Sequence, residues 1–245
     1  MSDPKGLVFT LVESGPNIPE EEYRGISNLI TSLGISNIDR LIRILDWYDN
    51  EHAPARITIP SFYSAARFKA NDGLKPTSLT LYEISEPSVA NGPEYQAIFA
   101  NGSERDKRMV PALQYLTRRS YSVTHLVSHS EASLPPKFIF YEAVEVKPEG
   151  EASFDRWLKE EHIPLIAKTP GWSRSRLLTL EEQILFGGSI ERHVPLYKYL
   201  AIHDFSSGGY RESAEVKAAI STPWKDTIGS EVRHFEFEKS YTKQK

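Results

Sequence analysis

Short stretches of alternating or continuous apolar residues divide the chain into predicted strands. In the first half these strands cover residues 7–13, 62–69, 78–84 and 119–127, and in the second half 138–146, 172–180, 196–204 and 233–241. Helices are predicted just before His52, over 93–116 with a break near 101–102, over 154–162 and over 212–220. Pro54 is expected to end the first helix, because proline lacks a backbone donor. Each half therefore has the order strand, helix, strand, strand, helix, strand.

The two halves also resemble each other in sequence, which indicates an internal repeat. Four residues of the first half recur 110 positions later: Trp47, Glu51, His52 and Pro54 become Trp157, Glu161, His162 and Pro164. A second proline in each segment is followed by an aromatic residue, Phe62 or Trp172. The flanking strands are aligned as 7–12 with 138–143, 79–83 with 199–203, and 120–121 with 240–241. This alignment matches Glu83 with His203.

The repeat predicts an α+β fold of two tandem ferredoxin-like βαββαβ units. The sheet of each unit has one face under helices and one bare face, and two units can cover each other's bare faces. One chain would then form a pseudo-dimeric α+β barrel. The polar, proline-containing segment 129–136 is the predicted linker between a first repeat over 1–128 and a second over 137–245.

The first repeat carries 21 extra residues before its tryptophan, at about 24–44. Apolar residues at helical spacing in this segment predict an added helical hairpin packed on the outside. The alternative is translated intron sequence in a gene model, because the repeat closes without the segment. A cDNA read across the region would decide between the two.

Composition narrows the possible functions. The chain has 245 residues, 40% of them hydrophobic, with 29 Lys and Arg against 33 Asp and Glu, a net charge of −4. No overall positive charge is available to hold a nucleic acid. The absence of cysteine excludes disulfides, thiolate nucleophiles and cysteine-ligated metals. No apolar run reaches the roughly 18 residues of a membrane span, and no secretory signal is recognised. A cytoplasmic protein without a membrane partner is expected.

The pattern Trp-(Tyr/Leu)-x-x-Glu-His-x-Pro, followed by Pro-x-aromatic, resembles the dimeric α+β barrel superfamily. It is most similar to the EthD-like branch, in the tandem two-repeat form common in fungi. The superfamily includes decarboxylases, isomerases, cofactor-free monooxygenases, haem-using enzymes and members without known activity. The resemblance implies a small hydrophobic metabolite, often aromatic or polyketide-like, bound in the barrel. It also implies that His52 and His162 point toward the cavity.

Three histidines are candidates for catalysis by general acid–base chemistry: His52, His162 and His203. Histidine exchanges protons near neutral pH with little tuning. For the first two, the alternative is a structural role at the end of a helix. Alternation along 197–204 is expected to point Tyr199 and His203 into the cavity, with the aliphatic face under helices.

Five further residues are candidates for substrate binding: Tyr199, Arg176, Trp172, Glu83 and Arg67. Tyr199 and Arg176 would orient an oxygen anion, since guanidinium suits planar anions. Trp172 would form a cavity wall, and Glu83 would face His203 across the barrel. Core packing of Trp172 and solvent exposure of the strand carboxylate and arginines are the alternatives.

No His-Glu-x-x-His or facial-triad spacing is present, so neither a tightly bound metal nor another cofactor is predicted. A third hypothesis is that the protein binds haem through His162 or His203. The leading hypothesis is a cofactor-independent enzyme, of lyase or isomerase type, in secondary metabolism. It would decarboxylate, isomerise, cyclise or dehydrate an aromatic or polyketide-like metabolite. The alternative is a non-catalytic ligand-binding or structural barrel. The repeat predicts a monomer acting as a pseudo-dimer, with a homodimer left open.

Overall fold

The computed structural model describes residues 4–14, 47–129, 134–188, 196–221, 224 and 227–243. The predicted insertion at 24–44 lies outside the described residues, as do residues 130–133 of the predicted linker. The strands are β1 Gly6–Glu13, β2 Phe62–Ala70, β3 Ser78–Ile84, β4 Tyr115–Ser128, β5 Phe138–Val146, β6 Trp172–Gly188, β7 Tyr199–Phe205 and β8 Thr227–Tyr241. The longer helices are α4 Pro93–Ala100, α5 Glu104–Ala112, α6 Glu151–Trp157 and α8 Ala214–Ser221. The shorter ones are η3 Tyr48–His52, α3 Ala53–Ile57, η4 Pro87–Asn91, η5 Pro148–Gly150, η6 Leu158–His162, α7 Ile163–Ile166 and η7 Gly208–Glu212.

In the described part of the chain, the strands close into one barrel in the order β1-β3-β2-β8-β5-β7-β6-β4. All neighbouring strands are antiparallel. The last strand of each half joins it to the other half, because β4 pairs with β1 and β6 while β8 pairs with β5 and β2. The predicted pseudo-dimeric α+β barrel is therefore confirmed, and closure leaves neither sheet with a free edge.

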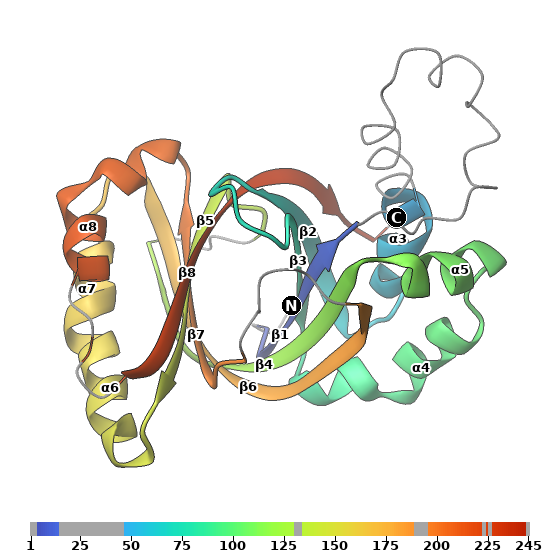
Figure 1. The fold of residues 1–245 in the computed structure, drawn as a ribbon, viewed down its shortest axis with the longest axis horizontal. Helices are drawn as coiled ribbons and strands as arrows, with labels where there is room; N and C mark the ends of the chain where they lie inside the picture. The colour runs from blue at the N-terminus through green and yellow to red at the C-terminus, as the bar shows by residue number, and fades with distance from the viewer. Residues whose placement is uncertain are drawn as a thin grey trace.

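The barrel separates three apolar regions. Its interior is filled by side chains from both halves, among them Leu7, Phe9, Phe68, Tyr141 and Phe235. The outer face of the first half lies under α3, α4 and α5, and that of the second half under α6, α7 and α8, at opposite ends of the molecule (Figure 1). Among the described residues, no helix combines the length and apolarity needed to cross a bilayer.

Strand pairing corrects the predicted alignment of the two halves. Phe62 pairs with Ile84 as Trp172 pairs with Phe205, so the position equivalent to His203 is Tyr82. Glu83 is equivalent to Asp204, and its predicted match with His203 is wrong by one residue. Because successive side chains of a strand point to opposite faces, this shift places Glu83 and His203 on opposite sides of the sheet.

The last strand of each half shows a larger error. Ala65 pairs with Tyr241, and Ser175, the equivalent of Ala65, pairs with Val127. Tyr241 therefore matches Val127, and the predicted match with Tyr121 is wrong by six residues. Serine followed by tyrosine is too common a pair to fix the register of a strand.

The predicted orientation of β7 is also wrong. Leu200 and Ile202 lie in the barrel interior with residues of β1, β2 and β5. Tyr199 contacts the apolar cluster under α6, and His203 lies on the same face. The interior receives side chains from both halves, and the aliphatic face of β7 packs against them there.

Proline does not end the first helix of each half. A five-residue π-helical turn precedes it, in which the N–H of Ala53 bonds the carbonyl of Tyr48 and that of Ile163 bonds Leu158. The helices then continue as α3 and α7, with the proline in their first turn, where a missing N–H costs no internal bond. The two histidines end these π-helical turns, which are often found at functional sites.

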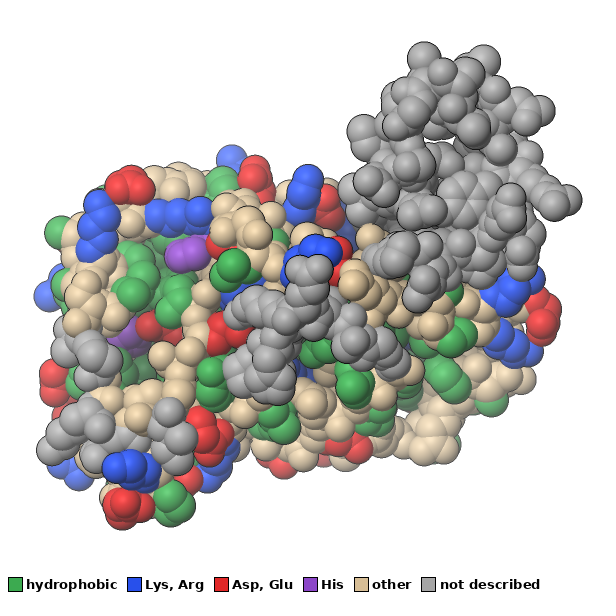
Figure 2. Space-filling view, in the orientation of Figure 1, with side chains coloured by type: hydrophobic (Ala, Val, Ile, Leu, Met, Phe, Trp, Pro, Cys, Tyr) green, Lys and Arg blue, Asp and Glu red, His purple; other side chains and the backbone are tan. Residues whose placement is uncertain are grey.

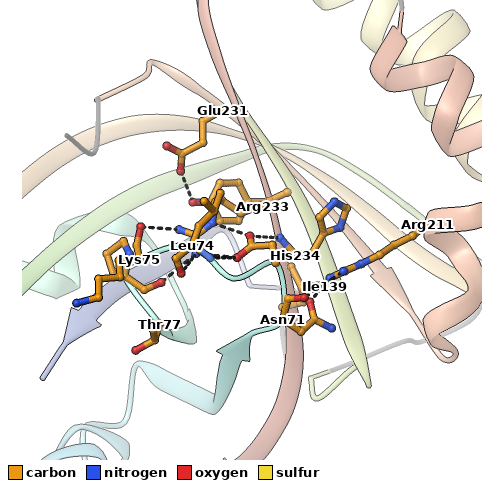
Figure 3. Close-up of polar contacts among 12 residues, drawn as sticks. Asn71, Leu74, Lys75, Thr77, Ile139, Arg211, Glu231, Arg233 and His234 are labelled. Atoms are coloured by element: carbon orange, nitrogen blue, oxygen red, sulfur yellow. Dashed lines mark hydrogen bonds and ion pairs between the residues drawn. The ribbon is translucent and has the colours of Figure 1, made fainter. Parts of the chain in front are cut away.

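One end of the barrel is closed by the turn between β2 and β3. Arg233 of β8 is fully buried, and Figure 3 shows it reaching this turn. Its Nε donates to Asp72 Oδ2 at 2.7 Å, and its Nη2 donates to the carbonyls of Leu74 at 3.0 Å and Pro76 at 2.9 Å. Asp72 also accepts from the backbone N–H of His234 at 3.0 Å. The turn is thereby fixed to the strand of the other half.

We expect Asp72→Asn to lower the free energy of unfolding by on the order of 2 kcal/mol at pH 7, because it weakens a charged hydrogen bond to a buried guanidinium. Burial raises the pKa of Asp72, but hydrogen bonds from Arg233, His234 and Leu74 outweigh it, and the pKa is lowered from its usual value of 3.8. Its contribution is therefore present above about pH 4 and lost as the pH falls through the folded-state pKa. Urea unfolding of both proteins at pH 7 and pH 3 measures this, and an unchanged difference at pH 3 would contradict the assignment.

Candidate active site

Glu142, His162 and His203 meet on the outer face of the second half. Glu142 comes from β5, His162 ends η6, and His203 comes from β7. Glu142 alternates with Tyr141 and Ala143, which face the barrel interior, so its side chain points toward the helices. On the face shown in Figure 2, hydrophobic and histidine side chains gather in the half covered by α6, α7 and α8.

The carboxylate of Glu142 is shared by the two imidazoles. Its Oε2 lies 2.5 Å from His162 Nε2 and 3.3 Å from His203 Nε2. Burial raises the pKa of Glu142, but attraction to His162 and the hydrogen bonds from both imidazoles outweigh it and lower the pKa to about 2. Glu142 is therefore an anion at every pH near neutrality; it is hydrogen-bonded to His162 and attracts Nε2 of His203 across 3.3 Å.

A chain of donors fixes the proton on His203. Trp172 Nε1, which can only donate, points at Ser175 Oγ at 2.8 Å. Ser175 Oγ in turn lies 2.7 Å from His203 Nδ1. Burial lowers the pKa of His203, so the ring is neutral and carries one proton. Because Nε2 faces the ionised Glu142, that proton is on Nε2, and the serine hydroxyl donates to Nδ1.

The equivalent histidine of the first half has a different partner. His52 Nδ1 bonds Asp106 Oδ1 at 2.8 Å, and Trp47 Nε1 donates to the same oxygen at 3.1 Å. Burial and the charge of Arg56 lower the pKa of His52 to about 4, in spite of Asp106. His52 is thus a neutral group whose Nδ1 is hydrogen-bonded to Asp106.

Among the described residues of the second half, His162 has no carboxylate equivalent to Asp106 beside it. At the start of α5, the side chain of Ser103 accepts a hydrogen bond from the N–H of Asp106. At the start of α8, Ser213 accepts the same bond from the N–H of Val216. Val216 therefore occupies the position of Asp106. Both histidines lie the same 4.6 Å from their tryptophan, measured between ring centroids. Among the described residues, Nδ1 of His162 is buried without a hydrogen-bond partner. With Nε2 donating to Glu142, this Nδ1 holds an unshared electron pair.

A small aromatic-lined pocket adjoins these residues. We call it the second-half pocket; its lining includes Glu142, Phe154, Trp157, His162, Tyr199, Ala201 and Trp224. Its volume is about 90 Å³, the same order as the roughly 150 Å³ apolar cavity that accepts benzene. The carboxylate and the imidazole are therefore placed against a space suited to an aromatic ring.

The predicted site residues are only partly brought together. His162, His203 and Tyr199 belong to this site, and Trp172 lies behind it, hydrogen-bonded to Ser175. His52 lies at the equivalent place in the first half. The predicted roles of these residues stay predictions.

The other three predicted site residues lie elsewhere. Arg67 is paired with Asp49 and Glu238 where β2 meets β8. Glu83 and Arg176 belong to an ion cluster on the inward faces of β3, β6 and β7, in which Arg176 is bonded to Asp204 at 2.8 Å. Sequence reasoning missed Glu142, although a single carboxylate in the middle of the apolar strand 138–146 was a usable signal.

The same three side chains have the chemistry of a metal site. One ligand atom from each of Glu142, His162 and His203 lies within 4.8 Å of the others. Two atoms bound to one ion at about 2.1 Å are usually about 3 Å apart. The 2.5 Å between Glu142 and His162 is shorter and corresponds to a hydrogen bond. Glu142 and His162 are therefore arranged as a hydrogen-bonded pair. The absence of a tightly bound metal stays a prediction.

Comparisons with known proteins agree on the fold. No protein-family model and no curated protein matches the sequence. The crystal structure of an anthrone oxidase-like protein is similar over 98% of this chain and 94% of that one, with 12% identity and a TM-score of 0.59. The crystal structure of a proposed monooxygenase from Lactobacillus acidophilus is similar over 98% of this chain and 97% of that one, with 10% identity and a TM-score of 0.54. At these identities the likeness concerns the fold alone. The chain has the ferredoxin-like, dimeric α+β barrel fold, with both halves in one polypeptide.

Proposed function

We propose that this chain is an enzyme that removes a proton from a small hydrophobic molecule, with Nδ1 of His162 as the base. The observation that carries the proposal is the pairing of His162: Nε2 is bound to Glu142 while Nδ1 is buried without a partner among the described residues. A buried polar atom left unpaired costs free energy, roughly 1–3 kcal/mol. A substrate proton directed at Nδ1 would offset that cost.

Glu142 makes His162 a better base. Once Nδ1 takes a proton, the ring becomes a cation, and the adjacent carboxylate stabilises it while holding its orientation. His203 and Ser175 keep Glu142 in place and ionised, so they are positioning residues. General base catalysis of this type is worth about 10²–10⁴ in rate.

The aromatic lining supports an aromatic or polyketide-like substrate. Phe154, Trp157, Tyr199 and Trp224 present ring faces and edges to the second-half pocket. Isomerisation, cyclisation and dehydration of such a molecule begin with loss of a proton next to a carbonyl or phenol. Decarboxylation ends with the return of one. We place the enzyme among lyases or isomerases of secondary metabolism that need no cofactor.

Oxygenation without a cofactor is the second candidate. The solved structures of this fold include an anthrone oxidase-like protein and a proposed monooxygenase. The anion formed when His162 removes a proton is also the species that would react with O₂. Oxygen uptake during turnover separates this candidate from the first.

We also propose that the chain belongs to the EthD-like branch, and that its two repeats cover 1–128 and 137–245. The motif Trp-x-x-x-Glu-His-x-Pro, present in both halves, supports the assignment. The catalytic residue of the motif is then His162 alone, since His52 is held by Asp106.

A non-catalytic barrel remains the alternative, and two observations bear on it. The barrel interior is filled by apolar side chains and by the ion cluster of Glu83, Arg174, Arg176 and Asp204, as a structural protein would require. In the second-half pocket, however, a carboxylate and an imidazole converge beside an apolar space, which is typical of an enzyme site. We therefore favour the enzyme and place its substrate outside the barrel, under the helices.

A thermal-melting screen against aromatic and polyketide-like metabolites tests the proposal. A ligand present at 100 times its dissociation constant stabilises the protein by about 2.7 kcal/mol. We expect the shift to disappear in Ala201→Leu, which fills the second-half pocket from β7, and to persist in His52→Gln. The melting temperatures of the unliganded variants verify their folding. The proposal fails if no ligand shifts the wild type, or if Ala201→Leu leaves every shift unchanged.

A further inference from the structure

The first half has a pocket of its own at the place equivalent to the candidate active site. This first-half pocket is lined by apolar residues of the barrel and of α4 and α5, and by Thr10, His52, Arg56, Tyr82, Tyr95 and Arg118. Thr10 stands where the second half has Glu142, and Tyr82 where it has His203. This pocket therefore keeps the equivalent of His162, which is His52, but not the carboxylate of Glu142 or the imidazole of His203.

Two buried guanidinium groups take its place. Arg56 of α3 is 4% exposed and Arg118 of β4 is 3% exposed. Arg118 pairs with Thr10 as Val232 pairs with Glu142, so Val232 is its equivalent. Arg56 corresponds to Ile166, which is fully buried in α7. The second half builds the same fold with two aliphatic residues, so the fold itself does not require these cations.

Helix α4 is a third feature found in only one half. From the end of β3 at Ile84 to the capping Ser103 the chain runs 19 residues, while the equivalent stretch from Phe205 to Ser213 runs eight. The additional residues form α4 and place Tyr95 over the pocket. The guanidinium carbons of Arg56 and Arg118 lie 5.8 Å and 4.8 Å from the centre of its ring. Both arginines and the added helix thus converge on one point.

Of the two arginines, Arg118 has a buried donor without a hydrogen-bond partner among the described residues, and the hydroxyl of Tyr95 lies within reach of both guanidinium groups. Arg56 Nη1 donates to the carbonyl of His52 at 2.7 Å, and among the described residues no carboxylate forms an ion pair with Arg56. Arg118 donates to Glu182 at 2.9 Å, to the carbonyl of Ala90 and to Asn91, but its buried Nε has no partner there. A buried donor without a partner is costly.

The local potential is positive. Burial would raise the pKa of Tyr95, but the charges of Arg56 and Arg118 outweigh it and lower that pKa. Arg56 also contributes to the low pKa of His52. The pocket therefore favours negative charge, whereas the second-half pocket contains a carboxylate.

We propose that the first-half pocket is a second ligand site, which binds the carboxylate of a small aromatic acid between Arg56 and Arg118. Guanidinium groups suit carboxylates in shape and charge. Phe62, Phe99 and Phe186 supply aromatic walls for the ring. The unfilled space is about 20 Å³, enough for part of the carboxylate. Binding of the ring therefore requires a lining side chain to move, and we assign this movement to Phe99, which is 48% exposed.

Equilibrium binding of 1-naphthoate, followed by its fluorescence, tests this site in the full chain. The neutral 1-naphthamide is the matched ligand without the charge. We expect the wild type to bind one naphthoate per chain, and the amide about tenfold or more weakly, because a charged hydrogen bond contributes about 1.5–3 kcal/mol. Arg56→Ile and Arg118→Val, which introduce the residues of the other half, should each weaken naphthoate by about tenfold or more. His162→Gln should leave its affinity unchanged.

Three results would overturn the proposal: no binding of naphthoate, equal binding of the amide, or loss of binding in His162→Gln with the arginine variants unaffected. The last of these would place the ligand in the second-half pocket. Melting temperatures report whether the variants fold. Arg118→Lys provides a variant that keeps the charge but loses the planar fork; it should bind naphthoate more weakly than the wild type and more tightly than Arg118→Val.

Discussion

Replacing His162 with Gln is expected to lower turnover by about 10²–10⁴-fold, the usual worth of a general base, with the fold intact. Glutamine can keep a hydrogen bond to Glu142 but cannot accept a proton. The measurement is product formation from a substrate identified by the melting screen, with kcat and KM determined separately. We expect the loss mainly in kcat, because the base acts in the transition state rather than in binding.

The first half supplies a matched control for this prediction. His52 occupies the equivalent position but is bonded to Asp106. His52→Gln should therefore leave kcat within about twofold of the wild type, well inside the range of general base effects. Glu142→Gln should behave like His162→Gln, because the neutral amide cannot stabilise the imidazolium. Equal losses from the two histidine variants would contradict the assignment of the base to His162.

Replacing Asp204 with Asn is expected to destabilise the protein by about 3–5 kcal/mol, the range found when a buried ion pair loses one partner. Asp204 is 1% exposed and accepts from Arg174 Nε at 2.7 Å and from Arg176 Nη2 at 2.8 Å. Arg174 also donates to Glu83 at 3.0 Å, so the cluster joins the two halves. Asparagine has the same shape, so the loss is of charge and not of volume.

Urea unfolding of wild type and Asp204→Asn at pH 7 measures this effect. The surface pair Lys107–Glu104 is the control, because exposed ion pairs contribute about 0–1 kcal/mol. Lys107→Ala should therefore change the free energy of unfolding far less than Asp204→Asn. A change below about 1 kcal/mol for Asp204→Asn would show that the remaining carboxylate, Glu83, balances both arginines on its own.

The sequence by itself determined the architecture. The repeated segment around His52 and His162, together with two sets of four predicted strands, specified two ferredoxin-like units and their closure into a barrel. These features are local: strand patterns have a period of two, and a repeated motif is visible along the chain. The sequence also identified His162, because the residue stands inside the motif itself.

Only the tertiary structure decided the site. The similarity between the halves outside the motif is too weak to fix strand register, and an error of one residue reverses every side chain of a strand. This error matched His203 with Glu83, and the separate expectation that helices cover the aliphatic face of β7 placed His203 in the barrel interior. Strand pairing instead puts His203 on the helix-covered face beside Glu142, which lies 20 residues before His162 and 61 before His203.

The difference between His52 and His162 is likewise decided by the tertiary structure. Both have the same motif residues around them, a Trp five positions before, a Glu directly before and a Pro two positions after, so nothing in the motif separates them. His52 meets Asp106, on a helix that chain folding brings to it, and the position equivalent to Asp106 in the second half is Val216, which cannot hydrogen-bond through its side chain. Hydrogen bonding depends on which distant side chain lies next to the ring. The sequence therefore determined where the two histidines stand in the chain. The fold decided that Nδ1 of His162 has no hydrogen-bond partner among the described residues.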